Sequence, residues 1–141
     1  MKFGRGVWLA AVLLLLGCRV SSSREGRSPE SLGSIPDDVP LPAKFVLDPG
    51  QGESRLEEKG GVRTMVLHLR GPFSAGEVVA FFRDHFRLAR WKPDPDASAN
   101  EGGLVFRKGG ETVEVRVEDR GRNSSGVTIL LNGGGEDGEH P

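Results

Sequence analysis

The sequence predicts an α+β domain in which one amphipathic helix packs on one face of a mostly antiparallel sheet of about five or six strands. Three observations support this class. Short segments of period two are separated by glycine and proline turns, one segment between residues 74 and 90 has a period of 3.6, and the order is strands, helix, strands. A chain of 141 residues suits one domain with tails, and we expect residues 36–131 to form that domain.

Three strand segments precede the helix. They cover residues 43–47, 54–58 and 62–69, and the last two flank Gly60-Gly61, a pair typical of a tight hairpin turn. Ser74 then begins the helix, since Ser74 and Glu77 have the spacing of a capping box. At 100° per residue one side of this helix is apolar, with Phe81 and Leu88 at its margins. The centre of that side holds Val78, Val79, Phe82, Phe86 and Ala89.

Three more strand segments follow the helix, after an expected loop over residues 92–103. Residues 104–107 and 111–118 are joined through Lys108-Gly109-Gly110, which is typical of a hairpin. Residues 126–131 form the last predicted strand. The Gly-rich acidic residues 132–141 are expected to be a disordered tail.

The amino-terminal residues 1–17 have the layout of a secretory signal. Lys2 and Arg5 precede a ten-residue apolar run, which is too short to span a bilayer as a helix. The residues that follow, Leu15-Leu16-Gly17-Cys18, resemble the lipobox of bacterial lipoproteins. That resemblance implies cleavage before Cys18, acylation of Cys18, and a membrane partner held through the acyl chains. Two or three acyl chains anchor a protein durably where one binds only marginally.

Residues 18–35 are polar and rich in turn formers, and we expect the lipidated Cys18 followed by a disordered tether. Arg19, rather than aspartate, resembles the outer-membrane-sorted members of the lipoprotein family, which implies a location facing the periplasm. The proline-rich segment 35–42, with Ile35, Val39 and Leu41, is expected to cross the domain as an extended strap. It also resembles the IPxDVPLP entry of many small bacterial lipoprotein domains.

Composition bears on several function classes. Removal of Lys2 and Arg5 with the signal leaves a net charge of about −3, so we expect no nucleic-acid partner. Cys18 is the only cysteine, so the domain has no internal disulfide. The three histidines lack ligand spacing, and no nucleophile and base lie together in a known pattern, so we expect no metal, no cofactor and no enzyme activity.

We therefore expect a membrane-anchored envelope lipoprotein that acts as a non-catalytic binding or assembly module. One alternative is a carrier of a small ligand or lipid in the groove between helix and sheet, and another is a small envelope hydrolase. Period-two alternation assigns the possible partner-binding residues to the face opposite the helix. They are Val62, Val66, Val105 and Leu130, and the partner would be an envelope protein.

Overall fold

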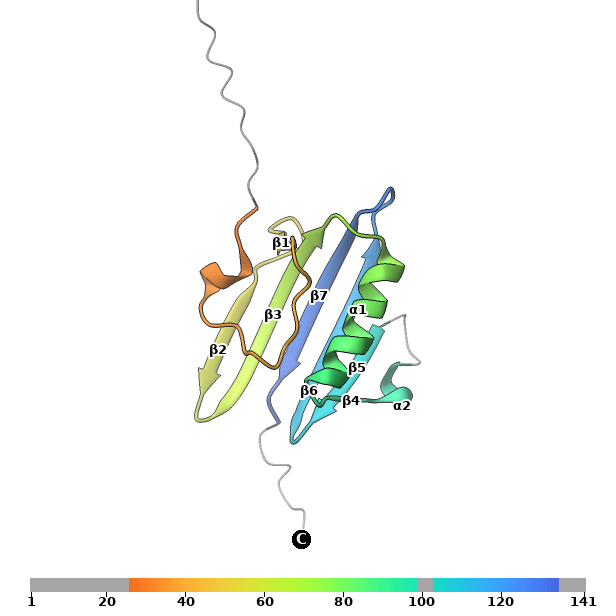
Figure 1. Ribbon diagram of the computed structural model, residues 1–141. Coiled ribbons are helices and arrows are strands. Elements are labelled where there is room, and N and C mark those ends of the chain that lie inside the picture. Colours follow the sequence, from red (N-terminus) through yellow and green to blue (C-terminus); the bar gives the residue numbers. More distant parts are fainter. Residues whose placement is uncertain (1–25, 99–102, 135–141) are drawn as a thin grey trace, which may run out of the picture.

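The computed structural model describes residues 26–98 and 103–134, and the predicted signal and Cys18 lie outside this part of the chain. It confirms the α+β class: an antiparallel sheet carries one long helix (Figure 1). The described strands are β1 Val46–Leu47, β2 Arg55–Lys59, β3 Val62–Gly71, β4 Lys92–Pro93, β5 Gly103–Lys108, β6 Glu111–Asp119 and β7 Ser125–Asn132. The helices are the 3₁₀ turn η1 Pro29–Leu32, α1 Ala75–Leu88 and the short α2 Pro95–Ser98.

The strand order is β1-β3-β7-β6-β5-β4, and β2 also pairs with β3. The last strand, β7, therefore lies between β3 and β6, where both of its edges are paired. Gly60 and Gly61 join β2 to β3 with φ values of 61° and 77°. Positive φ at both central residues is what a type I′ hairpin requires, and glycine adopts it without steric cost.

The helix α1 begins as predicted. The Ser74 hydroxyl accepts from the Glu77 amide at 3.4 Å, and the Glu77 carboxylate accepts from the Ser74 amide at 2.9 Å. Val78, Phe82 and Phe86 are buried against the sheet, where the Phe86 ring lies 4.5 Å from that of Phe106. The prediction for one margin of this face is wrong, because Leu88 is 75% exposed. It lies in the last turn of α1, about 200° around the helix from the buried Phe86, and therefore points away from the core.

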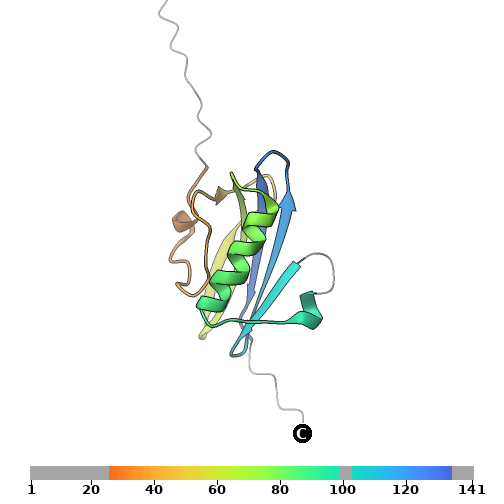
Figure 2. The ribbon, with the colours of Figure 1, turned by 45° about the vertical axis from the view of Figure 1, so that its right-hand side comes forward.

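The core lies between α1 and one face of the sheet (Figure 2). The inward residues of β3, β6 and β7 alternate with outward ones as period two requires, and eight of them are at most 3% exposed. The set is Met65, Leu67, Leu69, Val113, Val115, Val127, Ile129 and Leu131. Trp91, directly after α1, is also buried and donates its indole N–H to the Asp38 carbonyl at 2.8 Å.

The strap, residues 35–42, crosses on the same side of the sheet as α1 (Figure 1). Val39 is 4% exposed and belongs to the core, while Ile35 and Leu41 pack at its margin. The folded part begins earlier than expected, because residues 26–35 are not a disordered tether. Pro29 is buried in η1, and the Arg27 carbonyl accepts from the Leu47 amide at 2.8 Å. Apolar burial and this backbone bond fix a segment whose composition alone predicted disorder.

Two short elements occur where a loop was predicted. β4 pairs with β5 through Lys92 and Pro93, and α2 follows it. A two-residue strand has no detectable period, and proline is tolerated there because β4 is an edge strand. The described chain also extends slightly beyond residue 131: β7 ends at Asn132, and the Gly133 amide donates to the Arg63 carbonyl. The rest of the predicted tail, residues 135–141, lies outside the described part.

Candidate binding face

The sheet has two unlike faces. The strap and α1 lie on one of them, here called the covered face (Figures 1 and 2). The other, here called the outer face, carries the even-numbered residues of β3, β6 and β7. Along its centre the side chains are half-buried or exposed, as expected for an antiparallel sheet with one side toward solvent.

Three of the four predicted partner-binding residues lie in one row across the outer face. Val66 is directly opposite Leu130 on β7, Leu130 is opposite Glu114 on β6, and Glu114 is opposite Val105 on β5. Directly opposed residues have Cβ atoms about 5 Å apart, so Val66 and Leu130 form one continuous apolar contact. Both remain half-buried, which leaves apolar surface accessible beside them.

Two of the four predicted residues, Val105 and Val62, contribute less. Val105 is separated from Leu130 by Glu114 and is only 8% exposed, so it offers almost no surface to a partner. Val62 is half-buried and lies four residues along β3 from Val66, beyond the end of the pairing between β3 and β7. Strand pairing thus joins Val66 to Leu130 and places Val62 and Val105 at the margins.

Polar residues flank the Val66–Leu130 pair on both sides. Thr64 and Thr112 both pair with Asn132, which forms an uncharged row toward the β2–β3 turn. On the opposite side His68 pairs with Thr128, and the His68 Nδ1 lies 3.2 Å from the Thr128 Oγ1. An apolar centre within a polar rim is the usual composition of a modest protein interface.

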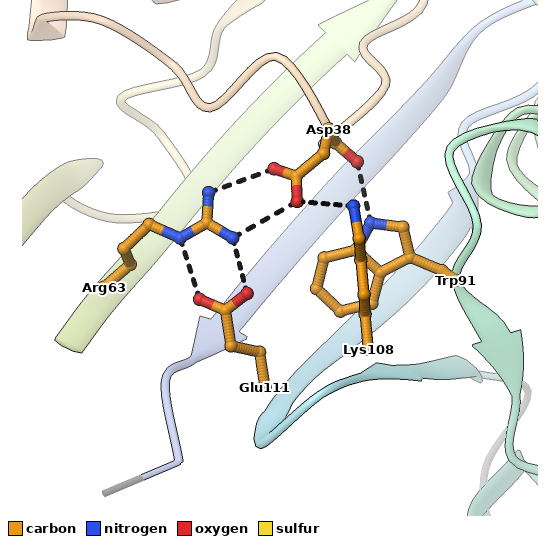
Figure 3. Close-up of polar contacts among 5 residues, drawn as sticks. All are labelled: Asp38, Arg63, Trp91, Lys108 and Glu111. Atoms are coloured by element: carbon orange, nitrogen blue, oxygen red, sulfur yellow. Dashed lines mark hydrogen bonds and ion pairs between the residues drawn. The ribbon is translucent and has the colours of Figure 1, made fainter. Parts of the chain in front are cut away.

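A charged cluster lies at the margin of the covered face (Figure 3). The Arg63 guanidinium donates to both oxygens of Asp38, at 3.0 and 3.2 Å, and to both oxygens of Glu111, at 2.7 and 2.5 Å. The Lys108 ammonium donates to Asp38 at 3.0 Å and lies 5.7 Å from the centre of the Trp91 ring. These contacts join the strap to β3, β5 and β6.

The charges of this cluster balance, because it contains two carboxylates and two cations. Partial burial alone would raise the pKa of Asp38, but the hydrogen bonds and charges of Arg63 and Lys108 lower it below its ordinary value. In turn Glu111 and Asp38 raise the pKa of Arg63. A carboxylate held ionised between two cations has no proton to give at neutral pH and is a poor base. The ion pairs of the cluster therefore tie the strap to the sheet.

The alternation of residues along β3 and β6 contains a signal for this cluster. Arg63 has the same parity as Met65, Leu67 and Leu69, and Glu111 has the same parity as Val113 and Val115. A charged residue at an inward-facing position requires a partner of opposite charge. Arg63 and Glu111 could thus have been predicted to pair, whereas the contribution of Asp38 depends on the path of the strap.

Two of the histidines and two of the serines lie in different parts of the described structure. His68 lies on the outer face, whereas His85 is on α1, stacked 3.9 Å from the Phe81 ring. His85 is exposed. The hydroxyl of Ser74 caps α1. Ser125 is fully buried, and no group of three or more His, Cys, Asp or Glu side chains suited to a metal occurs within residues 26–98 and 103–134.

The interface between α1 and the sheet is filled by side chains. Phe82, Phe86 and Ile129 are each 0% exposed, and the Phe82 and Phe86 rings lie 5.8 Å apart. A carrier would need these rings to separate before a ligand could enter. Concavities occur at the margins instead. One of about 710 Å³ lies beside the strap at Ile35 and Val39, and one of about 420 Å³ lies where Arg87 of α1 approaches Leu104 of β5.

Comparisons with models of protein families, with curated proteins and with solved structures find no match to this chain. Within the described residues, no helix has both the length and the apolar character needed to cross a bilayer.

Proposed function

We propose that the protein is a bacterial envelope lipoprotein, anchored through acyl chains on Cys18, which holds an envelope protein partner on the outer face of its sheet. The observation that carries the binding role is the Val66–Leu130 pair, an apolar contact at the centre of the face that neither α1 nor the strap covers. The anchoring role rests on the sequence Leu15-Leu16-Gly17-Cys18 after a charged start and an apolar run.

The organisation of the domain supports a binding role over a catalytic one. The charged cluster of Arg63 and Asp38 is internally neutral, and the histidines His68 and His85 lie on different layers of the fold. A small antiparallel sheet with one solvated face offers a flat surface, which suits a protein partner better than a small molecule.

The anchor is tested with Cys18→Ser. Because Cys18 is the only thiol, this substitution should abolish incorporation of a fatty-acid analogue and leave uncleaved precursor. Label that remains undiminished in the variant would contradict the lipoprotein assignment.

The binding face is tested with Val66→Glu and Leu130→Glu, each of which places a charge in the apolar centre. Leu88→Glu is the matched control, since Leu88 is the most exposed large apolar side chain of the described structure and lies on α1. Tagged proteins are recovered from chemically cross-linked envelopes. We expect the two sheet variants to lose a partner that the wild type and Leu88→Glu retain, with melting temperatures that remain close to wild type. Equal recovery by all four folded proteins would contradict the assignment of this face.

A further inference from the structure

A basic concavity lies at the end of the sheet where the described chain begins. It has a volume of about 450 Å³, and three cationic side chains line it, Lys44, Arg70 and Arg120, together with Asn123 and Ser124. These residues come from three separate parts of the sequence. Pairing of Val46 with Arg70 brings β1 to the end of β3, and pairing of Gly71 with Ser125 brings in the β6–β7 turn.

The cations of this concavity differ in their partners. Arg120 is paired with Asp48 at 2.5 Å and with Glu118 at 3.7 Å, so its charge is compensated. Neither Lys44 nor Arg70 forms an ion pair with any carboxylate of residues 26–98 and 103–134. Two uncompensated cations beside the amide of Asn123 and the hydroxyl of Ser124 provide the donors that a phosphate group accepts.

Packing fixes where the concavity lies relative to Gly26, the first described residue. Val46 lines the concavity and packs so closely on Gly26 that any side chain at position 26 would collide with it. Arg70 also lines the adjacent concavity of about 610 Å³, together with Gly26 and Arg27. In Figure 1 the first described residues, β1 and the β6–β7 turn lie at the same end of the sheet.

The chain between Cys18 and Gly26 limits how far this end can lie from the anchor. Eight residue steps separate the two positions. Fully extended they span at most about 29 Å, and a flexible chain of that length has a typical reach of roughly 16 Å. The covalent connection therefore keeps the basic end within reach of the bilayer surface, while the β2–β3 turn lies at the opposite end of the sheet (Figure 1).

We propose that the basic concavity binds the phosphate of an anionic membrane lipid through Lys44 and Arg70, and so turns this end of the domain toward the bilayer. The nearness to the membrane rests on the anchor at Cys18 proposed above, whereas the phosphate chemistry rests on the concavity alone. The formal net charge of −1 concealed this site in the sequence, because its cations are 26 and 50 residues apart along the chain.

The orientation has a consequence for the binding face. The strands run away from the basic end. The outer face would therefore be roughly parallel to the membrane normal rather than flat on the bilayer. Val66 and Leu130 lie about midway along β3 and β7, several residues from the basic end. A partner could then reach them from the side while the lipid contact is made.

The test is hydrogen exchange measured by mass spectrometry on the full chain reconstituted in vesicles. One set contains phosphatidylcholine alone and the other contains phosphatidylcholine with phosphatidylglycerol. We expect peptides covering residues 44–46 and 120–124 to exchange more slowly in the anionic vesicles, by about 3- to 30-fold, as two basic side chains at a charged surface would produce. Lys44→Gln combined with Arg70→Gln should remove the difference.

The matched control is Lys59→Gln combined with Lys92→Gln, which removes the same charge from exposed positions away from the basic end. It should keep the lipid-dependent protection. Equal exchange in both vesicle types, or equal loss of protection in the two double variants, would overturn the proposal. The same measurement is made on the full chain in detergent with added inorganic phosphate. It distinguishes binding of a lipid phosphate from binding of free phosphate. Protection by phosphate without protection by anionic vesicles would overturn the lipid assignment.

The mass of the reconstituted chain shows independently whether Cys18 carries acyl chains. Acylated protein without lipid-dependent protection would overturn the basic concavity as a lipid site and leave the anchor intact. Protection without acylation would overturn the anchor and support the concavity.

Discussion

The covered and outer faces alternate residue by residue along the same strands, yet they contribute in different ways. On β7, Ile129 is 0% exposed beneath α1, while its neighbour Leu130 is half-buried and faces outward. The covered face draws residues from the strap, α1 and every long strand into one core. The outer face joins its apolar residues only across β3 and β7. The covered face therefore accounts for stability, and the outer face leaves surface for a partner.

We expect the largest loss of stability from a substitution on the covered face. Phe82 is fully buried and contacts the Phe81 and Phe86 rings, at 5.3 and 5.8 Å between centroids. We expect Phe82→Ala to lower the free energy of unfolding by about 3–5 kcal/mol, because it removes a large side chain and leaves a cavity. Urea denaturation measures the change. Leu88→Ala, on the exposed end of the same helix, is the control and should alter stability by less than about 0.5 kcal/mol. Similar losses in the two variants would contradict the placement of α1.

The charged cluster shows how much the margin of the covered face contributes to stability. Arg63→Gln leaves the Asp38 and Glu111 carboxylates without their shared cation, and each has a side chain about a quarter exposed. We expect a loss of about 1–3 kcal/mol, the range for hydrogen bonds to charged groups at partly solvated sites. Arg55→Gln, on the exposed strand β2, is the control and should be nearly neutral. A neutral Arg63→Gln would mean that the strap is held by Val39, Trp91 and Lys108 without a contribution from Arg63.

The same cluster predicts how stability depends on pH. The pKa of Asp38 is lowered in the folded protein, so the stability it adds is fully present above its unfolded value of about 3.9 and is lost as pH falls through the folded value. The difference in unfolding free energy between wild type and Asp38→Asn should therefore shrink below about pH 4. Denaturation at several pH values measures this difference. A difference in unfolding free energy between the two proteins that stays constant down to about pH 2–3 would contradict the charged state assigned to Asp38.

The smallest effect is expected on the outer face. Leu130→Ala removes a half-buried side chain that is opposed to Val66 on β3 and Glu114 on β6, and we expect a loss below about 1 kcal/mol. Ile129→Ala, one residue earlier on the same strand, should cost about 2–5 kcal/mol. Thermal or urea denaturation of the two variants compares the faces directly. A loss at Leu130 as large as that at Ile129 would mean that the outer face is itself packed.

The sequence predicted the covered face better than the outer one, for a physical reason. Burial of Met65, Leu67 and Leu69 follows from alternation within a single strand, and the start of α1 follows from Ser74 and Glu77. The composition of the outer face depends on which residues of different strands are opposed. Alternation placed Val105 outward, but β4 and α2 pack against β5, and Val105 is only 8% exposed.

Long-range pairing also explains what could not be predicted. The parity of Arg63 and Glu111 indicated inward charges, but their link to Asp38 requires the strap to cross β3. The basic concavity requires Lys44, Arg70 and Arg120 to meet through strand pairing. Likewise η1 is fixed by the contact between residue 27 and β1, which its polar composition did not indicate.

The most direct test of the outer face as the binding surface is site-specific photo-cross-linking in intact cells. A diazirine-bearing amino acid replaces Leu130 in one strain and Leu88 in another, so both probes stand at accessible apolar positions on opposite sides of the domain. The account predicts a discrete protein adduct from position 130 and none of the same mass from position 88. The same adduct from position 88 alone, or no adduct from position 130, would contradict it.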